Sequence, residues 1–275
     1  MTSTSSTQIA AFFDLDKTVI ARSSALAFTK PFFEGGLLTR RAMLRSAIAQ
    51  LQFHLASAEE DQVARLRKHV IQMSTGWSTD QVREIVSETL DEVVRPVIFS
   101  EAAALIAEHK KAGHDVALIS ASGIEMVEPI GALLGVDCVR ASIMHVEDGH
   151  YSGALDFYCY GENKSVAIRE LADERGYDLA QCFAYSDSST DLPMLKAVGH
   201  PAVVNPDRVL RRHAAENGWE ILDFPDPLPS AAWATKPAVT RTALCATAIG
   251  AAAAMAVAYQ LRHSQSARSA GTKDF

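Results

Sequence analysis

The sequence is poor in cysteine and has no excess of basic residues, and both shortages exclude classes of function. Its four cysteines are scattered through 275 residues without a C-x-x-C pair. They predict no disulfide framework and no zinc site, and they suit a reducing cytosol. A net charge of -7 argues against nucleic acid as a partner, because phosphate backbones select basic surfaces. Residues 1–8 lack the charged and apolar regions of a signal peptide and are expected to form a disordered tail.

Apolar patterning divides the chain into a sheet-forming part and a helical part. Residues 9–22 and 97–222 alternate short apolar runs, such as Val116–Ile119, with helix-spaced segments. This alternation predicts an α/β fold with a doubly wound parallel sheet, and the two ranges are expected to form its core domain. Residues 23–96 have helical periodicity and no strand pattern. They predict an all-helical cap, inserted between the first and second strands.

Local signals predict where several elements begin and turn. Ser78 followed by Gln81 is a capping-box pattern that opens a helix. Ser100 is expected to cap the next helix, which ends near Gly113. The Asp-Gly pair at 148–149 predicts a hairpin between two strand-like runs.

The composition changes after residue 222. Residues 223–240 are rich in proline and are expected to form a linker. Segment 241–262 holds an uncharged stretch between Arg241 and Arg262, and its length suits a transmembrane helix. Because the stretch is mostly alanine, an exposed or core-packed helix is the alternative. Residues 263–275 form a polar, basic tail. The first alternative gives a cytoplasmic catalytic domain that a C-terminal helix anchors to the membrane.

The first apolar run ends in two carboxylates. Residues 9–13 are apolar, and Asp14, Asp16 and Thr18 follow at alternate positions. The carboxyl ends of parallel strands are where open α/β sheets bind ligands, and a buried strand needs no polar group there for its stability. Two acids this close repel each other, so we expect something cationic between them.

Polar groups recur at later strand ends and helix starts. In chain order they are Ser120, Lys164, Asp187 and Asp191. Together with Asp14-Leu15-Asp16-Lys17-Thr18, they resemble the four motifs of the haloacid dehalogenase superfamily, spread over residues 9–205. The all-helical insertion and the Ser-Ala-Ser-Gly at 120–123 resemble subfamily IB, the phosphoserine-phosphatase-like group.

The resemblance implies a phosphatase mechanism. Asp14 would be the nucleophile that forms an aspartyl-phosphate, and Asp16 would protonate the leaving alcohol and then deprotonate the attacking water. Ser120 would hydrogen-bond the transferring phosphoryl group. Lys164 would offset the negative charge on Asp14 and on the phosphate.

The resemblance also implies a magnesium cofactor. Mg²⁺ prefers oxygen ligands, so Asp14, Asp187 and the main-chain carbonyl of Asp16 are the expected set. Asp191 would orient Lys164 or a metal-bound water. The residues expected to bind the phosphate or the rest of the substrate are Thr18, Ser122, Gly123 and Arg22.

The substrate is left open by the sequence. Phosphoserine phosphatases have a glutamate a few residues beyond the first motif to meet the substrate ammonium. This chain has Ala21-Arg22-Ser23-Ser24 there and no acid before Glu34. If Arg22 faces the site, a more anionic or non-amino substrate is favoured.

Several functions remain open at this point. We expect a small phosphorylated substrate and no nucleic acid, whereas the oligomeric state cannot be predicted. The uncharged stretch before Arg262 suggests the alternative of a membrane-tethered phosphatase for lipid phosphates or lysophospholipids. A phosphotransferase that passes the phosphoryl group to another alcohol is also open, as is a catalytically idle binding module of the same fold.

Overall fold

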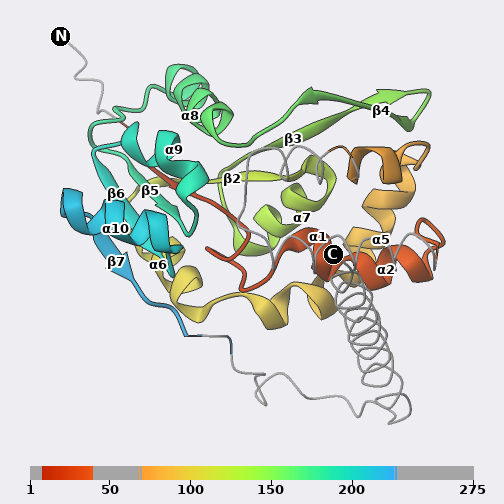
Figure 1. Ribbon diagram of the computed structural model, residues 1–275, viewed down its shortest axis with the longest axis horizontal. Coiled ribbons are helices and arrows are strands. Elements are labelled where there is room, and N and C mark those ends of the chain that lie inside the picture. The colour runs from red at the N-terminus through yellow and green to blue at the C-terminus, as the bar shows by residue number, and fades with distance from the viewer. Residues whose placement is uncertain (1–7, 40–67, 69, 226, 228–275) are drawn as a thin grey trace, which may run out of the picture. The chain divides into compact units, whose positions relative to one another are not determined.

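The computed structural model describes residues 8–39, 68, 70–225 and 227, and Figure 1 shows how their elements are arranged. In chain order the elements are β1 (Ala10–Phe13), α1 (Ser24–Ala27), α2 (Thr29–Glu34), α5 (Thr79–Val93), a 3-10 helix (Arg95–Val97), α6 (Ser100–Lys111), β2 (Asp115–Gly123), α7 (Ile124–Leu134), β3 (Cys138–Glu147), β4 (His150–Phe157), α8 (Glu162–Arg175), β5 (Phe183–Ser186), a 3-10 helix (Ser189–Asp191), α9 (Leu192–Lys196), β6 (His200–Val204), α10 (Arg208–Asn217) and β7 (Glu220–Leu222).

The strands form one seven-stranded sheet in the order β4-β3-β2-β1-β5-β6-β7. Neighbouring strands are parallel except β3 and β4, which pair antiparallel as the hairpin predicted at 148–149. The predicted doubly wound sheet is confirmed. β1 lies between β2 and β5 because the chain continues first on one side of it and later on the other. Such a reversal point is where open α/β sheets place their ligands.

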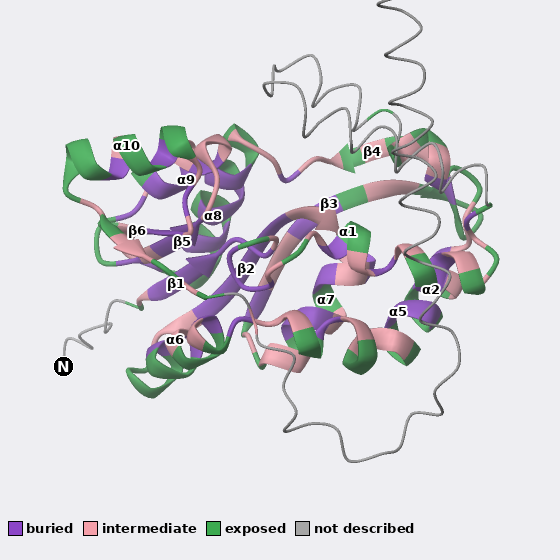
Figure 2. Ribbon diagram, turned by 60° about the horizontal axis from the view of Figure 1, so that its bottom comes forward, coloured by how far each residue is buried: buried purple, intermediate pink, exposed green. Residues whose placement is uncertain are grey.

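Both faces of the sheet are covered by apolar packing. Along β1, Phe13 joins a cluster that includes residues of α6 and α7, whereas Phe12 joins a second cluster that includes residues of α8, α9 and α10. This alternation follows from the two-residue period of a strand, and it explains why β1 reads as an unbroken apolar run. In Figure 2 the strands at the centre of the sheet are correspondingly buried.

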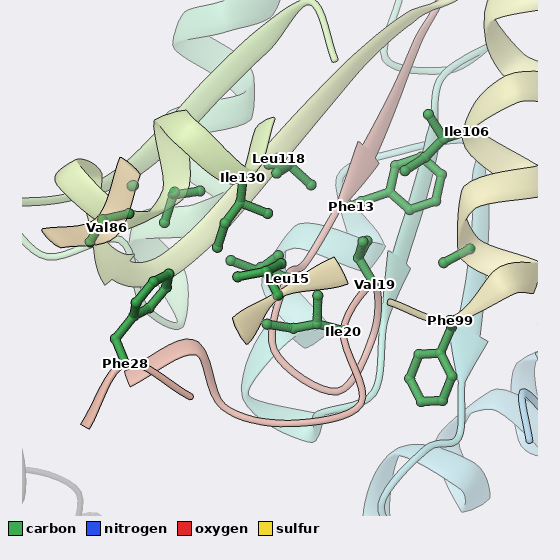
Figure 3. Packing of buried hydrophobic residues seen from close by; sticks show 14 of the residues in the cluster. Phe13, Leu15, Val19, Ile20, Phe28, Val86, Phe99, Ile106, Leu118 and Ile130 are labelled. Carbon is green, nitrogen blue, oxygen red and sulfur yellow. The ribbon is translucent and has the colours of Figure 1, made fainter. Parts of the chain in front are cut away.

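The first cluster continues into the helices that follow β1. Phe28, between α1 and α2, and Val86 of α5 belong to the same cluster as Leu118 of β2 and Ile130 of α7. Figure 3 shows Leu15 and Ile20, from the turn after β1, close together among these side chains. The turn that carries the two carboxylates is therefore anchored by its own apolar residues. The division into a core domain and a separate cap stays a prediction.

Helix starts agree with the sequence only in part. Ser78 caps α5 as predicted, with its hydroxyl accepting from the Gln81 amide at 3.4 Å. The Gln81 side-chain amide donates to the Gly35 carbonyl at 2.8 Å. Ser100 does not cap α6: Phe99 holds that position, and the Ser100 hydroxyl donates to its neighbour Glu101. An adjacent carboxylate competes with the helix end for the hydroxyl.

The predictions for both ends of the chain concern residues that the structure does not describe. Positions 1–7, most of the linker 223–240, and all of 241–262 and 263–275 lie outside the described residues. Within the described part, no helix has the length and apolar character that crossing a bilayer requires. The transmembrane helix and the basic tail stay predictions.

Gly199 lies at a position where the fold leaves no room for a side chain. A Cβ added to it would lie 1.8 Å from the Ala180 carbonyl oxygen, which is backbone and has no rotamer with which to move aside. We expect Gly199→Ala to lower the free energy of unfolding by at least about 2 kcal/mol, as measured by urea denaturation. Gly123→Ala is the control, since its added carbon makes only an ordinary contact, at 3.7 Å. Equal effects of the two substitutions would contradict the steric argument.

Candidate active site

The predicted polar residues converge at the carboxyl end of β1. Asp14 follows the strand directly, and its amide donates to the Tyr185 carbonyl of β5 at 2.9 Å. Ser120 lies near the end of β2, and Asp187 follows the end of β5. Because β2 and β5 flank β1, the sheet order brings together residues that lie far apart in the sequence.

Lys164 joins two of the acids. Its Nζ lies 2.5 Å from Oδ1 of Asp14 and 2.7 Å from Oδ2 of Asp191, and its side chain is only 3% exposed. The Ser186 hydroxyl donates to the same Asp191 oxygen at 2.7 Å. Asp191 occupies the N-cap position of α9, but its side chain makes no capping bond. Its carboxylate instead holds the ammonium group beside Asp14.

Burial dominates the electrostatics of this group. It raises the pKa of Asp14 to about 8, although the Lys164 ammonium opposes the shift. Burial likewise raises the pKa of Asp187 to about 7, against the attraction of Lys17. For Lys164 itself, burial lowers the pKa, but the charges of Asp14 and Asp191 outweigh it and hold the pKa above its usual range. The site therefore carries more negative charge than its one buried lysine balances.

Asp16 has a different environment from Asp14. Its Oδ1 accepts from the Ser24 amide at 2.9 Å, and its Oδ2 from the Ser122 hydroxyl at 3.4 Å. The hydroxyls of Ser24 and Ser122 lie 2.6 Å apart. Burial raises the pKa of Asp16, and the hydrogen bonds from Ser24 oppose the rise. The two carboxylates of the first motif thus differ in partners, as groups with different roles require.

The remaining predicted residues are placed unequally. Thr18 is 1% exposed, and within the described part its hydroxyl has no hydrogen-bond partner. Ser120 is also buried, and its hydroxyl accepts from the Ser122 amide at 3.2 Å. Gly123 ends β2 and precedes α7. Arg22 is exposed, and it forms no ion pair with another described residue.

Three further residues belong to the site. Ser24 holds Asp16, Ser186 holds Asp191, and Lys17 lies close enough to lower the pKa of Asp187. Lys17 also takes a left-handed backbone conformation, with φ of 66°, in the turn after Asp16. Because Lys17 lies inside the first motif, the sequence could have identified it as a site residue. The sequence alone could not identify the two serines, because their role depends on which strands are neighbours in the sheet.

The donor set fits the predicted metal. Among the described residues, no group of three or more His, Cys, Asp or Glu side chains is placed to hold an ion. The predicted set is smaller, with two carboxylates and one carbonyl, and Mg²⁺ completes such sets with water. Burial is the main cause of the raised pKa of Asp14, and the charge of Asp187 adds to it. A divalent cation between the two carboxylates would offset that charge.

Comparison with known proteins places the chain among hydrolases and phosphatases. The family model for haloacid dehalogenase-like hydrolases matches residues 11–196. A Mycobacterium tuberculosis protein named "Probable phosphatase" is 55% identical over 92% of this chain and 88% of its own length. A phosphoserine phosphatase of the same species is 36% identical over 78% of this chain and 70% of its own. A solved structure from Bordetella pertussis, of unknown function, has a TM-score of 0.69 and 25% identity, covering 79% of this chain and 99% of that one.

Proposed function

The chain belongs to the haloacid dehalogenase-like hydrolases and is a phosphoric monoester hydrolase, and on this basis we propose that it hydrolyses a small organic phosphate through an aspartyl-phosphate on Asp14. The observation that supports the proposal most is the placement of Asp14. Its carboxylate lies at the end of the central strand, beside a buried ammonium group, with Asp16 two positions further on. Phosphoryl transfer needs this combination of nucleophile, neutralising charge and proton donor.

In the first step, a carboxylate oxygen of Asp14 attacks phosphorus and the bond from phosphorus to the ester oxygen breaks. The leaving oxygen takes a proton from the Asp16 carboxyl, so an alcohol departs. The raised pKa of Asp16 favours the protonated form that this step uses. Lys164 stabilises the negative charge shared by Asp14 and the phosphoryl group.

In the second step, Asp16 returns to its acid form. Its carboxylate takes a proton from a water molecule while the water oxygen attacks phosphorus. The bond between phosphorus and Asp14 breaks, inorganic phosphate leaves, and both aspartates regain their starting states. Ser120 and the buried Thr18 hydroxyl are the donors that we assign to the phosphoryl oxygens. Asp191 keeps Lys164 in place throughout.

Magnesium fits this scheme as the cofactor. Asp14, Asp187 and the carbonyl of Asp16 would hold it, and when bound it would offset charge on the phosphoryl oxygens. Burial is the main cause of the raised pKa values of Asp14 and Asp187, and the negative charge of Asp191 adds to both, which supports a cation at this position.

Replacing Asp16 by asparagine tests the proton-transfer role. We expect Asp16→Asn to slow phosphate release from alkyl phosphates by about 10²- to 10⁴-fold, since their leaving alkoxide needs a proton. Release of p-nitrophenolate from its phosphate should be slowed much less in the first step, because that group leaves as an anion. The measurement is the pre-steady-state burst with each substrate, in magnesium, with a chelated sample as the blank.

Two outcomes would contradict the proposal. Equal slowing of the burst for both kinds of ester would remove the acid role from Asp16. A folded wild-type protein that releases no phosphate from a broad panel, with magnesium present, would favour the catalytically idle binding module. Asp148→Asn is the matched control, since this residue lies at the turn of the β3–β4 hairpin and should leave both rates unchanged.

A further inference from the structure

Two serine hydroxyls lie beside the Asp16 carboxyl, and the proposed mechanism uses neither of them. Ser24 is fully buried at the start of α1, whereas Ser122 is partly buried near the end of β2. Their oxygens are 2.6 Å apart. Buried hydroxyls need hydrogen-bond partners, and the partner that these two share is Asp16.

The hydrogens of the pair can be arranged in two ways, and both end on Asp16. The Ser122 hydroxyl lies 3.4 Å from Oδ2 of Asp16, and the Ser24 hydroxyl also bonds to the carboxyl. Each serine has one hydrogen to donate. Because one hydroxyl donates to the other across the 2.6 Å contact, the receiving hydroxyl is left to donate to the carboxyl. The pair therefore supplies one charge-assisted hydrogen bond to Asp16 in either arrangement.

The two oxygens of the Asp16 carboxyl are held differently. Oδ1 accepts from the Ser24 amide at 2.9 Å, and a backbone amide can only donate. Oδ2 contacts the Ser122 hydroxyl, which can rotate either to donate or to accept. The better acceptor in a neutral carboxyl is its carbonyl oxygen, so the acid form keeps its proton on Oδ2. This oxygen is therefore the one that exchanges a proton with the leaving group and with water.

The backbone at Ser122 is held by its own hydrogen bond. The Ser122 amide donates to the Ser120 hydroxyl oxygen at 3.2 Å. The pairing of β2 with β3 shifts register between Ser120 and Gly123, and such an irregularity changes the direction in which a side chain points. Because its hydroxyl is engaged by Ser24 and Asp16, Ser122 is placed to serve the acid rather than the phosphate.

We propose that Ser24 and Ser122 are positioning residues, which hold the Asp16 carboxyl in the orientation from which Oδ2 gives its proton to the leaving oxygen and takes one back from water. The inference rests on the proposed function and deepens it. The serines donate hydrogen bonds and transfer no proton: the proton moves from Oδ2 to the ester oxygen in the first step, and from water to Oδ2 in the second. Their bond is strongest to the carboxylate that the first step leaves behind, and without it the carboxyl would turn away from the reacting atoms.

Removing one hydroxyl tests the inference through the leaving group. We expect Ser122→Ala to slow phosphoenzyme formation from alkyl phosphates about 5- to 50-fold, because their leaving oxygen needs the proton. Formation from p-nitrophenyl phosphate should change little, since that group leaves as an anion. The measurement is a rapid-quench single turnover with each ester, in magnesium. Ser24→Ala keeps the amide bond to Asp16 but removes the other hydroxyl, and it should give the same pattern.

A double-mutant cycle separates positioning from packing. Asp16→Asn removes the carboxyl, so Ser122→Ala should cause little further loss with alkyl phosphates when it is added to that variant. Ser74→Ala is the matched control, because it removes a buried hydroxyl that donates to the carbonyls of Val70 and Ile71 in its own helix. Both rates of this control should stay at the wild-type values. The thermal midpoint of each variant shows whether it is folded.

The outcomes separate this inference from the proposed function. If Asp16→Asn slows alkyl esters selectively but Ser122→Ala slows both kinds of ester equally, or neither, the function stands and the inference fails. Additive losses in the cycle also overturn the inference, because the hydroxyl then acts without Asp16. If Ser24→Ala does not fold, Ser122→Ala at the less buried position decides the matter. If the wild type hydrolyses no ester, both proposals fail.

Discussion

Asp14→Asn is expected to reduce phosphate release by about 10⁴-fold or more, the largest effect on activity in this protein. The amide oxygen is a far weaker nucleophile than a carboxylate, and of the two acids that pair with Lys164 only Asp14 directly follows β1. The measurement is single-turnover phosphate release with the best ester of the panel. Acid-quenched samples should show a phosphoryl group added to the wild type by mass spectrometry, and none added to the variant.

The same substitution should leave the fold intact. Burial raises the pKa of Asp14 to about 8, so the ionised carboxyl is held at a cost that a neutral amide does not carry. Lys164 keeps its bond to Asp191 at 2.7 Å. We therefore expect a thermal midpoint close to that of the wild type. A variant that keeps more than a few per cent of the activity while folded would show that Asp14 is not the nucleophile.

The arrangement of the sheet could be predicted because the apolar pattern of each strand agrees with its buried place in the sheet. Strands such as Val116–Ile119 are apolar runs buried on both faces, and the turn at 148–149 has the chemistry of a hairpin. β7 was not predicted. Its three residues, Glu220–Leu222, pair with β6 at the edge of the sheet and are too short to show a period. The predicted cap at Ser100 is wrong because the Ser100 hydroxyl donates to the neighbouring Glu101 carboxylate.

The site was predictable in its acids and its lysine but not in their supports. Asp14 and Asp187 each lie just beyond a short, mostly apolar strand, and this pattern can be read from the sequence alone. The bonds to Asp16 come from Ser24, 8 positions away, and from Ser122, 106 positions away, and the two serine hydroxyls contact each other across 98 positions. They exist because β2 pairs with β1 and because the chain turns sharply at Lys17.

Lys164→Met is expected to lower the free energy of unfolding by about 3–5 kcal/mol, the largest effect on stability. Methionine keeps the length of the side chain, but it leaves Asp14 and Asp191 buried without the ammonium group that joins them. The remaining carboxylates repel each other, so the pKa of Asp14 should rise further above the unfolded value of 3.8. The measurement is urea denaturation, without magnesium, with the wild type beside the variant.

The pH dependence of that loss identifies its cause. A carboxyl whose pKa is raised by folding binds more protons in the native state, so the stability of the native variant increases as the pH falls through that pKa. Wild-type Asp14 also becomes neutral there, and Lys164 then has less to balance. The stability deficit of Lys164→Met should therefore shrink between about pH 8 and pH 5.

Two further variants serve as controls. Lys110→Met breaks an ion pair with Asp137 in which the lysine side chain is 40% exposed, and it should cost at most about 1 kcal/mol at either pH. In the double variant Lys164→Met/Asp191→Asn, part of the loss should be recovered, because one of the two stranded charges is gone. A deficit that is unchanged by pH and by the second substitution would mean that Lys164 stabilises the fold through packing rather than charge.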